Sequence, residues 1–346
     1  MKAAVLHGPH DLRVEDVPDA RVEEPTDAVV RVTHASVCGS DLHRYRGTFA
    51  PTGTARPGHE FLGVVEEVGT QVAGVQPGDL VVSPFSISCG LCPPCLAGHF
   101  TSCDEGDFFG GDTTPGAQAE SVRVPHADGT LWAIPPAMRD EALFPALLLL
   151  GDVAGTGEHA ARMGQVAAGD VVVVVGDGAV GCLAVAAARR RDPELVVAVG
   201  HHPDRLALAS QFGADVLVDG RDVHVVDEVV ALTGGRSADV VLETVGGGQE
   251  PLDLALALVR DFGRIASVGV FEAGPAMSAR EAFGRNLTVS FGVAPTRAYL
   301  DDLAALIASG VFDPSPVLTD RLPLVEAAQA YRQMTDRSAL KVLLTP

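Results

Sequence analysis

Short apolar runs separated by glycine and proline fill roughly the first 140 residues of the chain. Runs of this kind cover residues 29–32, 63–68, 80–82 and 121–124. Apolar, β-branched segments of this length between turn residues are typical of strands in antiparallel sheets. We therefore predict an antiparallel, partly barrel-like body for this part of the chain.

The pattern changes near residue 169. Residues 171–175 are consecutive valines, which is typical of a strand buried on both faces of a parallel sheet. Beyond them, strand-like runs alternate with segments of helical periodicity. The predicted strands cover residues 195–199, 216–218, 239–243 and 263–268, and the predicted helices 179–191, 204–212, 225–232 and 252–259. This alternation predicts an α/β fold of the Rossmann type, a doubly wound parallel sheet.

The alternation ends near residue 285, and the remaining chain predicts a helix over 299–309 and a last strand over 341–344. A length of 346 residues suits about two domains. We predict that residues 1–145 form a mostly β domain, that 146–284 form the doubly wound domain, and that 285–346 return to the first.

Charge and hydropathy exclude two classes of partner. The net charge of -20 argues against nucleic-acid binding, which depends on Lys and Arg. The most apolar run, residues 142–150, is interrupted by Pro145 and is shorter than the roughly 20 residues that span a bilayer. The first residues resemble a strand and turn rather than a secretory leader. We expect a cytoplasmic protein without nucleic-acid or membrane partners.

A glycine-rich turn follows the valine strand and opens the next predicted helix. Gly176, Gly178 and Gly181 fit the G-x-G-x-x-G pattern in the context that dinucleotide binding requires. The three glycines allow a tight turn, close approach of the pyrophosphate and close packing of helix on strand. Asp177 adds a negative charge inside this turn, and we expect its side chain to point to solvent.

The end of the second strand predicts which dinucleotide binds. Gly200 stands where NAD-binding proteins carry an acidic residue for the ribose 2′-hydroxyl. Without that charge a 2′-phosphate meets no repulsion, and His201, His202 and Arg205 could contact it. We predict that NADP is preferred and that NAD is possible. The alternative, that the histidines only solvate a surface loop, stays open.

Cysteines are crowded into one short loop. Cys89, Cys92, Cys95 and Cys103 have the spacing C-x2-C-x2-C-x7-C within residues 84–110. Four thiolates on one loop suit a closed, tetrahedral, structural zinc. Paired disulfides are the alternative, which the expected compartment disfavours. The isolated Cys182 is interpreted as a small core residue.

Two further clusters complete a pattern. Cys38, Gly39, Ser40, Asp41 and His43 form one, and Gly58, His59 and Glu60 the other. Together with the cysteine loop and the glycine turn, in this order, they resemble the zinc-containing medium-chain alcohol dehydrogenases. The resemblance extends from Lys2 to Lys341. It implies that the first domain is a GroES-like catalytic domain.

The resemblance also implies a catalytic zinc. Cys38 and His59 match two of its ligands, and Asp152 matches the aspartate that replaces a cysteine ligand in several bacterial members. Glu60 resembles the glutamate that enters the coordination shell when water and substrate exchange, and Asp41 resembles the carboxylate that orients the metal-bound histidine.

The implied reaction moves a hydride between an alcohol, aldehyde or ketone and a nicotinamide dinucleotide. Zinc is the Lewis acid for the oxygen, and Ser40 and His43 match the family's proton relay. The alternatives are a zinc-free quinone or enoyl reductase and a noncatalytic NADPH-binding protein. The presence of all three zinc ligands argues against the first.

Further positions carry over from the family. Thr156 and Val180 resemble residues on the nicotinamide ring, Val268 a backbone contact of the carboxamide, and Lys341 a base on the pyrophosphate. Phe85 and residues 108–115 resemble the wall of the substrate pocket. The family also implies a homodimer or homotetramer, and an alcohol or aldehyde of low molecular mass as substrate.

Overall fold

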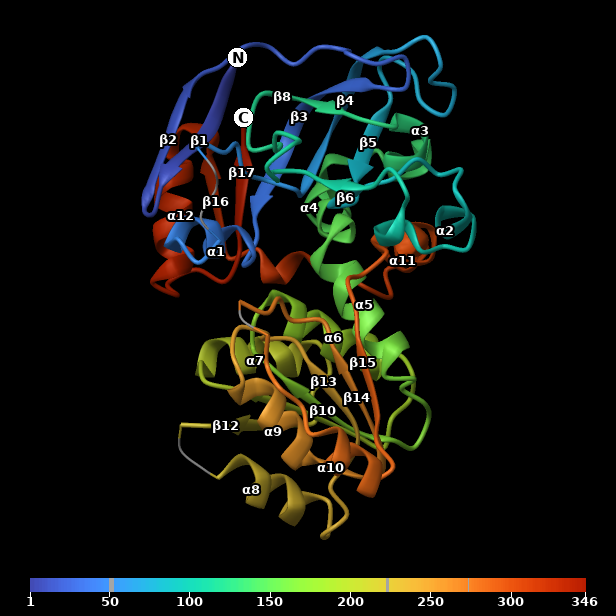
Figure 1. The fold of residues 1–346 in the computed structure, drawn as a ribbon, viewed down its shortest axis with the longest axis vertical. Helices are drawn as coiled ribbons and strands as arrows, with labels where there is room; N and C mark the ends of the chain where they lie inside the picture. The colour runs from blue at the N-terminus through green and yellow to red at the C-terminus, as the bar shows by residue number, and fades with distance from the viewer. Residues whose placement is uncertain (50–52, 222–223, 273) are drawn as a thin grey trace. The chain divides into compact units, whose positions relative to one another are not determined.

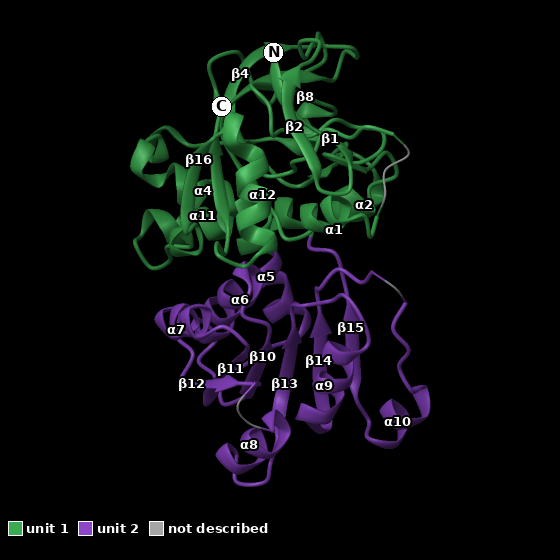
Figure 2. Cartoon of the chain, turned by 90° about the vertical axis from the view of Figure 1, so that its left-hand side faces the viewer, with its two compact units in different colours: residues 1–155, 295–346 green, residues 156–294 purple. Residues whose placement is uncertain are grey.

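The computed structural model describes residues 1–49, 53–221, 224–272 and 274–346. The chain forms two compact units (Figure 2): unit 1 comprises Met1–Gly155 and Pro295–Pro346, and unit 2 comprises Thr156–Ala294. Both divisions lie later in the chain than the sequence predicted, after residues 155 and 294 rather than 145 and 284. The second moves because strand β15 (Thr288–Phe291) pairs in parallel with β14 (Val259–Ser267) and so extends the sheet of unit 2.

Unit 1 is built on a seven-stranded sheet, in which the order is β16-β17-β3-β4-β5-β9 and β8 also pairs with β3. The strands are β3 (Ala28–Val37), β4 (Phe61–Val68), β5 (Leu80–Ser83), β8 (Ser121–Val124), β9 (Trp132–Ala133), β16 (Asp320–Pro323) and β17 (Val342–Thr345). All pairs except β16 with β17 are antiparallel, which confirms the predicted β body. Two small sheets, β1 (Lys2–Gly8) with β2 (Asp11–Asp16) and β6 (Ser86–Ile87) with β7 (Asp107–Phe108), complete it.

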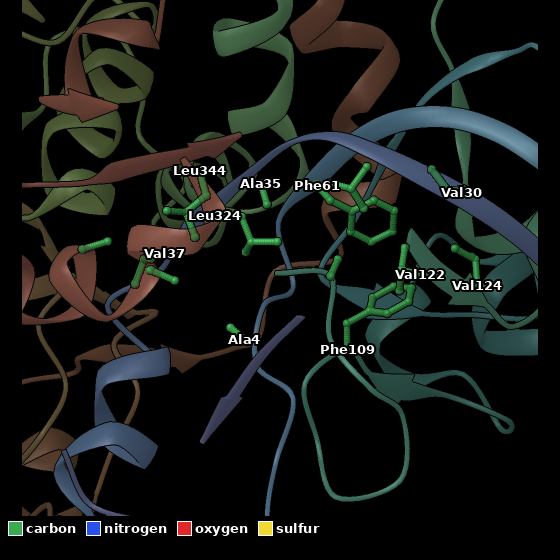
Figure 3. Packing of buried hydrophobic residues seen from close by; sticks show 14 of the residues in the cluster. Ala4, Val30, Ala35, Val37, Phe61, Phe109, Val122, Val124, Leu324 and Leu344 are labelled. Atoms are coloured by element: carbon green, nitrogen blue, oxygen red, sulfur yellow. The ribbon is translucent and has the colours of Figure 1, made fainter. Parts of the chain in front are cut away.

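The hydrophobic core of unit 1 lies against this sheet (Figure 3). Phe61 of β4 and Phe109 meet edge to face with ring centroids 5.2 Å apart. Helix α12 (Ala327–Thr335) closes the core with Ala327, Ala330, Tyr331 and Met334, a spacing that places them on one helical face. The sequence analysis did not predict this helix.

The other helices of unit 1 are short. They are α1 (Asp41–Arg46), α2 (Pro93–Leu96), α3 (Ala127–Thr130), α4 (Phe144–Leu148) and α11 (Leu300–Ala308). Helix α5 (Val153–Met163) starts at the end of unit 1 and continues into unit 2. Across the described residues, no helix has both the length and the apolar character needed to cross a membrane.

Unit 2 contains the predicted doubly wound sheet, with six parallel strands in the order β12-β11-β10-β13-β14-β15 (Figure 1). The remaining strands are β10 (Val171–Val175), β11 (Leu195–Gly200), β12 (Val216–Asp219) and β13 (Ala238–Glu243). The helices are α6 (Ala179–Arg189), α7 (Pro203–Gln211), α8 (Val225–Leu232), α9 (Glu250–Leu258) and α10 (Ala279–Gly284). The chain order reverses between β10 and β13, so the carboxyl ends of these two strands border the crevice where such sheets bind ligands.

Candidate active site and dinucleotide site

Three side chains from distant parts of unit 1 converge on one point. Cys38 follows the end of β3, His59 precedes β4, and Asp152 immediately precedes α5. The Sγ of Cys38 lies 3.2 Å from the Oδ2 of Asp152, and the Nε2 of His59 lies 3.1 Å from the same oxygen. The potential ligand atoms all lie within 4.8 Å of one another. A thiol, an imidazole and a carboxylate in this arrangement form the donor set of a zinc site with an open position.

The carboxylate of Asp41 holds two of these groups in place. Its Oδ2 accepts a hydrogen bond of 3.0 Å from the backbone N–H of Cys38, which fixes the turn between β3 and α1. Its Oδ1 lies 3.3 Å from the Nδ1 of His59. With Nδ1 engaged, Nε2 is the nitrogen directed at Cys38 and Asp152, so Asp41 lies where an orienting carboxylate is needed.

Behind Asp41 lies a buried layer that the sequence analysis missed. The amide nitrogen of Gln118 donates to the Oδ2 of Asp41 and to the carbonyl of Ser36, both at 3.2 Å. The hydroxyl of Tyr331 on α12 donates to the Oε1 of Gln118 at 2.9 Å. Nothing in the local pattern identifies these residues, because their function depends on contacts between segments far apart in sequence.

The site favours a cation. Burial lowers the pKa of His59, but the charges and hydrogen bonds of Asp41 and Asp152 raise it well above its usual value. Burial raises the pKa of Cys38, and the charge of Asp152 raises it further. Burial also opposes ionisation of Asp152, but its contacts with His59 hold the pKa of that carboxyl below its usual value. A divalent ion would balance a thiolate at Cys38 and the carboxylate at Asp152.

Glu60 and Lys341 form a buried pair, which the sequence analysis did not predict. The ammonium of Lys341 donates to the Oε2 of Glu60 and, at 3.2 Å, to the carbonyl of Val37. Only 1% of Lys341 is exposed. β17 runs antiparallel to β3 with Val342 opposite Val37, and this register places Lys341 inside unit 1. Its charge is therefore engaged by Glu60 within unit 1, and the contact with a pyrophosphate stays a prediction.

The two oxygens of Glu60 have different surroundings. Oε2 also accepts from the hydroxyl of Ser36, whereas Oε1 is buried without a hydrogen-bond partner among the described residues. Burial raises the pKa of Glu60, and the charge of Lys341 acts against that rise. An orphaned carboxylate oxygen one residue from His59 is compatible with the predicted role as an exchange ligand, which stays a prediction.

The predicted relay begins beside the three converging side chains. The Oγ of Ser40 lies 3.5 Å from the Nε2 of His59. His43 is one turn along α1, where its ring packs against Phe49 at 5.4 Å. The ring of Phe85 meets His59 edge to face at 6.3 Å and stacks on Phe108 at 5.9 Å. Phe85 and Phe108 therefore form an aromatic surface next to the site.

The cysteine loop brings four sulfurs together. The sulfurs of Cys89, Cys92, Cys95 and Cys103 lie within 4.8 Å of one another, and all are free thiols rather than disulfides. The backbone N–H groups of Cys89 and Cys92 donate to the sulfurs of Cys103 and Cys89 at 3.2 and 3.4 Å. Hydrogen bonds from the backbone of Asp104 and Cys95 lower the pKa of Cys92 to about 7. These bonds favour the thiolate of Cys92, the form that binds metal, whereas burial raises the pKa of Cys95 to about 12.

The glycine turn of unit 2 has the geometry of a phosphate-binding turn. Gly176 has a φ of +118°, a value that favours glycine. A Cβ on Gly181 would lie 2.0 Å from the carbonyl oxygen of Gly176, so the start of α6 can approach the turn only with glycine there. A Cβ on Gly178 would meet nothing within 4 Å. Gly178 therefore borders open space at the N-terminus of α6, where backbone N–H groups can bind an anion.

Asp177 does not point to solvent, so that prediction is wrong. Its Oδ2 accepts hydrogen bonds from the backbone N–H groups of His201 and His202, at 2.6 and 2.8 Å, and lies 2.9 Å from the Nδ1 of His202. The side chain is 11% exposed. It reaches across to the end of β11 because Gly200 leaves room for it. The expected preference for NADP assumed that no carboxylate lies at this strand end, and that premise fails.

The remaining predicted cofactor residues all lie in unit 2. Thr156 is buried on α5, whereas Val180 and Val268 are partly exposed at the start of α6 and just after β14. The backbone N–H of Val268 donates to the carbonyl of Glu243 at 3.0 Å. Arg205 lies on α7, where its carbonyl accepts from the thiol of the buried Cys182. Cys182 is a core residue, as predicted.

Comparison with known proteins agrees with this geometry. Residues 24–136 match the family described as the alcohol dehydrogenase GroES-like domain, and residues 179–309 match zinc-binding dehydrogenase. The zinc-type alcohol dehydrogenase B of Aspergillus flavus is 35% identical over 99% of this chain and 81% of its own length. The chain belongs to the zinc-containing medium-chain alcohol dehydrogenases. The resemblance inferred from its motifs is thus confirmed.

Solved structures of family members have the same fold. Alcohol dehydrogenase TADH from Thermus sp. ATN1 matches with a TM-score of 0.92 and 36% identity, covering 100% of this chain and 99% of that one. A zinc-binding dehydrogenase from Sinorhizobium meliloti, solved bound to NADP, matches with a TM-score of 0.86 and 27% identity, covering 100% and 99%. This medium-chain dehydrogenase is therefore a zinc-dependent oxidoreductase with an α/β fold, as the sequence predicted.

Proposed function

We propose that this chain interconverts small alcohols with their aldehydes or ketones, using a nicotinamide dinucleotide, one catalytic zinc and one structural zinc per chain. The observation that carries the proposal is the convergence of Cys38, His59 and Asp152, with Asp41 behind them. A site with three protein donors leaves a position for substrate. The four-cysteine loop has no such opening and suits a structural ion.

Each residue around the site has a defined task in this proposal. Cys38, His59 and Asp152 hold the catalytic zinc, which supplies a Lewis acid for the substrate oxygen. Asp41 keeps the His59 ring in the tautomer and orientation that present Nε2. During oxidation the Oγ of Ser40 takes up the alcohol proton while its own hydroxyl proton leaves towards His43. Phe85 and Phe108 exclude water from one side of the substrate.

Unit 2 binds the dinucleotide. The N-terminus of α6 at Gly178 receives the pyrophosphate, because its free N–H groups and dipole favour an anion. Thr156 and Val180 contact the nicotinamide ring, and the backbone at Val268 meets its carboxamide. The edge strand β15 carries the half-exposed Phe291, and Val293 follows it with 56% exposure. This apolar edge supports assembly into a homodimer or homotetramer.

Two other functions are less well supported. A zinc-free quinone or enoyl reductase would leave the convergence of a thiol, an imidazole and a carboxylate without a purpose. A noncatalytic dinucleotide-binding protein would leave Ser40 beside the same site unexplained. Zinc content separates the first alternative from the proposed dehydrogenase, and turnover separates the second.

The test combines metal analysis, alkylation and turnover on the purified full-length chain. We expect about two zinc ions per chain by elemental analysis and protection of Cys38 from iodoacetamide in the native protein. A panel of alcohols and aldehydes, each with NAD(H) and NADP(H), should give zinc-dependent turnover. One zinc per chain together with a reactive Cys38 would contradict the catalytic site. Two zinc ions without turnover on any substrate would favour the noncatalytic alternative.

A further inference from the structure

The turn that binds the pyrophosphate also sends a carboxylate to the end of the second strand. Asp177 lies between Gly176 and Gly178, yet its Oδ2 contacts the backbone N–H groups of His201 and His202, which follow β11. In doubly wound sheets that bind NAD, an acidic residue at the end of this strand accepts a hydrogen bond from the 2′-hydroxyl of the ribose. The carboxylate of Asp177 thus occupies the location of that residue although it comes from a different part of the chain.

Gly200 and Asp177 form a complementary pair. A Cβ on Gly200 would lie 2.5 Å from both the Cβ and the Oδ2 of Asp177 and 2.7 Å from its Cγ. These separations are too short for any side chain at position 200 while Asp177 keeps its place. The end of β11 has no acidic side chain of its own at position 200, because the carboxylate of Asp177 from the glycine turn fills that space.

The surroundings keep Asp177 charged. Burial opposes its ionisation, but the hydrogen bonds from His201 and His202 hold the pKa of Asp177 below its usual value. The three contacts with described residues all involve Oδ2, so Oδ1 is left to accept another hydrogen bond. At neutral pH the strand end therefore carries a carboxylate with one oxygen available.

We propose that Asp177 determines dinucleotide specificity in this chain and selects NAD(H) over NADP(H). This inference rests on the proposed dinucleotide site of unit 2. The Oδ1 of Asp177 accepts a hydrogen bond from the ribose 2′-hydroxyl of NAD, which requires a donor at that position. The 2′-phosphate of NADP has no hydrogen to donate in its fully ionised form, and it carries a charge of about −1.5 to −2 at neutral pH.

The groups that could bind a 2′-phosphate are already engaged by Asp177. The backbone N–H groups of His201 and His202 donate to its Oδ2, and the Nδ1 of His202 lies 2.9 Å from the same atom. A 2′-phosphate at the end of β11 would lie next to the carboxylate of Asp177. Like charges a few ångströms apart in a partly buried site repel strongly enough to change affinity by about tenfold or more.

Direct binding measurements test this proposal without the need for turnover. NADH and NADPH are titrated into the full-length, zinc-loaded protein, and the dissociation constants are obtained from nicotinamide fluorescence. The wild type should bind NADH at least about tenfold more tightly than NADPH. Asp177→Asn keeps the shape and the backbone contacts but removes the charge. It should shift the ratio at least about tenfold towards NADPH.

Two further variants complete the design. Asp177→Ser removes the charge with a smaller side chain and should shift the ratio in the same direction if the asparagine variant is unstable. Asp204→Asn removes one exposed negative charge from the first turn of α7 and should leave the ratio within about twofold of the wild type. Thermal melting of all variants confirms that the compared proteins are folded.

The possible outcomes separate the two proposals. Equal or tighter NADPH binding by the wild type, or an unchanged ratio in both Asp177 variants, would overturn the role of Asp177 alone. Equal weakening of both dinucleotides in Asp177→Asn would assign the residue a structural role and would also overturn it. If the wild type bound neither dinucleotide, the proposed function would fall, and this inference with it.

Discussion

The two clusters of potential metal ligands in unit 1 differ in how the chain assembles them. Cys89, Cys92, Cys95 and Cys103 come from one loop whose only helices are a four-residue α2 and one short 3-10 turn. Cys38, His59 and Asp152 come from three separate segments and lie at the ends of elements that pack on a seven-stranded sheet. The first cluster is local and mostly half-buried, whereas the second is dispersed and mostly buried.

This difference indicates how each cluster depends on its ion. The loop has little core of its own, and two of its apolar side chains, Leu91 and Leu96, are 81% and 75% exposed. Its shape must therefore depend on a crosslink between the sulfurs. The dispersed cluster is held by the fold through Asp41, Gln118 and Tyr331. Removal of the ion should therefore unfold the cysteine loop, whereas at the dispersed site it should abolish activity and leave the fold intact.

The largest effect is expected for Asp152→Ala. Loss of this ligand should lower kcat/KM by about 10³-fold or more, because the Lewis acid is lost or misplaced. The melting temperature should change by only a few degrees, since the fold rests on the surrounding sheet. Steady-state kinetics, zinc content and thermal melting check this.

Asp140→Ala is the matched control for this substitution. Asp140 is an exposed carboxylate of unit 1 that caps a short 3-10 turn. Its replacement should leave zinc content and kcat/KM unchanged within about twofold. An Asp152→Ala protein that kept two zinc ions and most of its activity would show that Asp152 is not a ligand.

The next largest effect is expected for Cys103→Ser in the loop. The loop zinc should be lost and the free energy of unfolding should fall by several kcal/mol, because binding to a structural site contributes directly to folding. Protease cleavage within residues 84–110 should become faster. Cys182→Ser is the control, since that buried cysteine lies outside both clusters. Retention of a second zinc in Cys103→Ser, with an unchanged melting temperature, would contradict a structural role.

The same contrast explains how much could be predicted from the sequence. The cysteine loop follows from spacing alone, because its ligands are neighbours in the chain. The doubly wound sheet follows from the valine run and the alternation after it. The dispersed cluster could be inferred only from its resemblance to a family, because no local pattern relates Cys38 to Asp152.

The side-chain contacts that the sequence analysis did not predict depend on how strands pair. Lys341 is placed by the register of β17 on β3, and Asp177 is placed by the pairing of β10 with β11. The hydrophobic pattern predicts that β10 and β11 are neighbours, but it does not give the direction of the Asp177 side chain or the register of β17 on β3. β15 was missed for a related reason, since a four-residue edge strand that is partly exposed lacks the continuous apolar run of a central strand.

A smaller effect on kcat is expected for the two residues of the proposed proton relay, Ser40 and His43. Ser40→Ala should lower kcat by about 10²-fold, because the hydroxyl lies 3.5 Å from His59 and takes part in proton transfer. His43→Ala should cost less, since solvent can accept a proton at the outer end. The pH dependence of kcat should change in both variants, whereas a purely structural role would leave it unaltered. A larger loss for His43→Ala would reverse the proposed direction of the relay.

The smallest effect is expected for Glu158, a second buried carboxylate. Comparison with Asp152 tests whether a buried negative charge is by itself enough to form a metal site. Glu158 lies on α5, a few residues after Asp152, and its side chain is 7% exposed. Arg162, Arg190 and Arg191 each make an ion pair with it, at 2.8, 2.8 and 2.6 Å. Its charge is therefore balanced by the protein, whereas that of Asp152 faces a thiol and an imidazole.

Glu158→Gln should destabilise the protein by about 1–3 kcal/mol at pH 7 and leave zinc content unchanged. Burial opposes ionisation of Glu158, but hydrogen bonds from Arg191 and Arg162 hold its pKa below the usual value of 4.5. A lowered pKa in the folded state stabilises the protein above the unfolded-state pKa, and this contribution is lost as the pH falls through the folded-state value. The difference in melting temperature between wild type and variant should thus be largest near neutral pH and shrink below pH 4.5. A difference that stayed constant from neutral pH down to acid would show that the ion pairs of Glu158 do not supply the stabilisation.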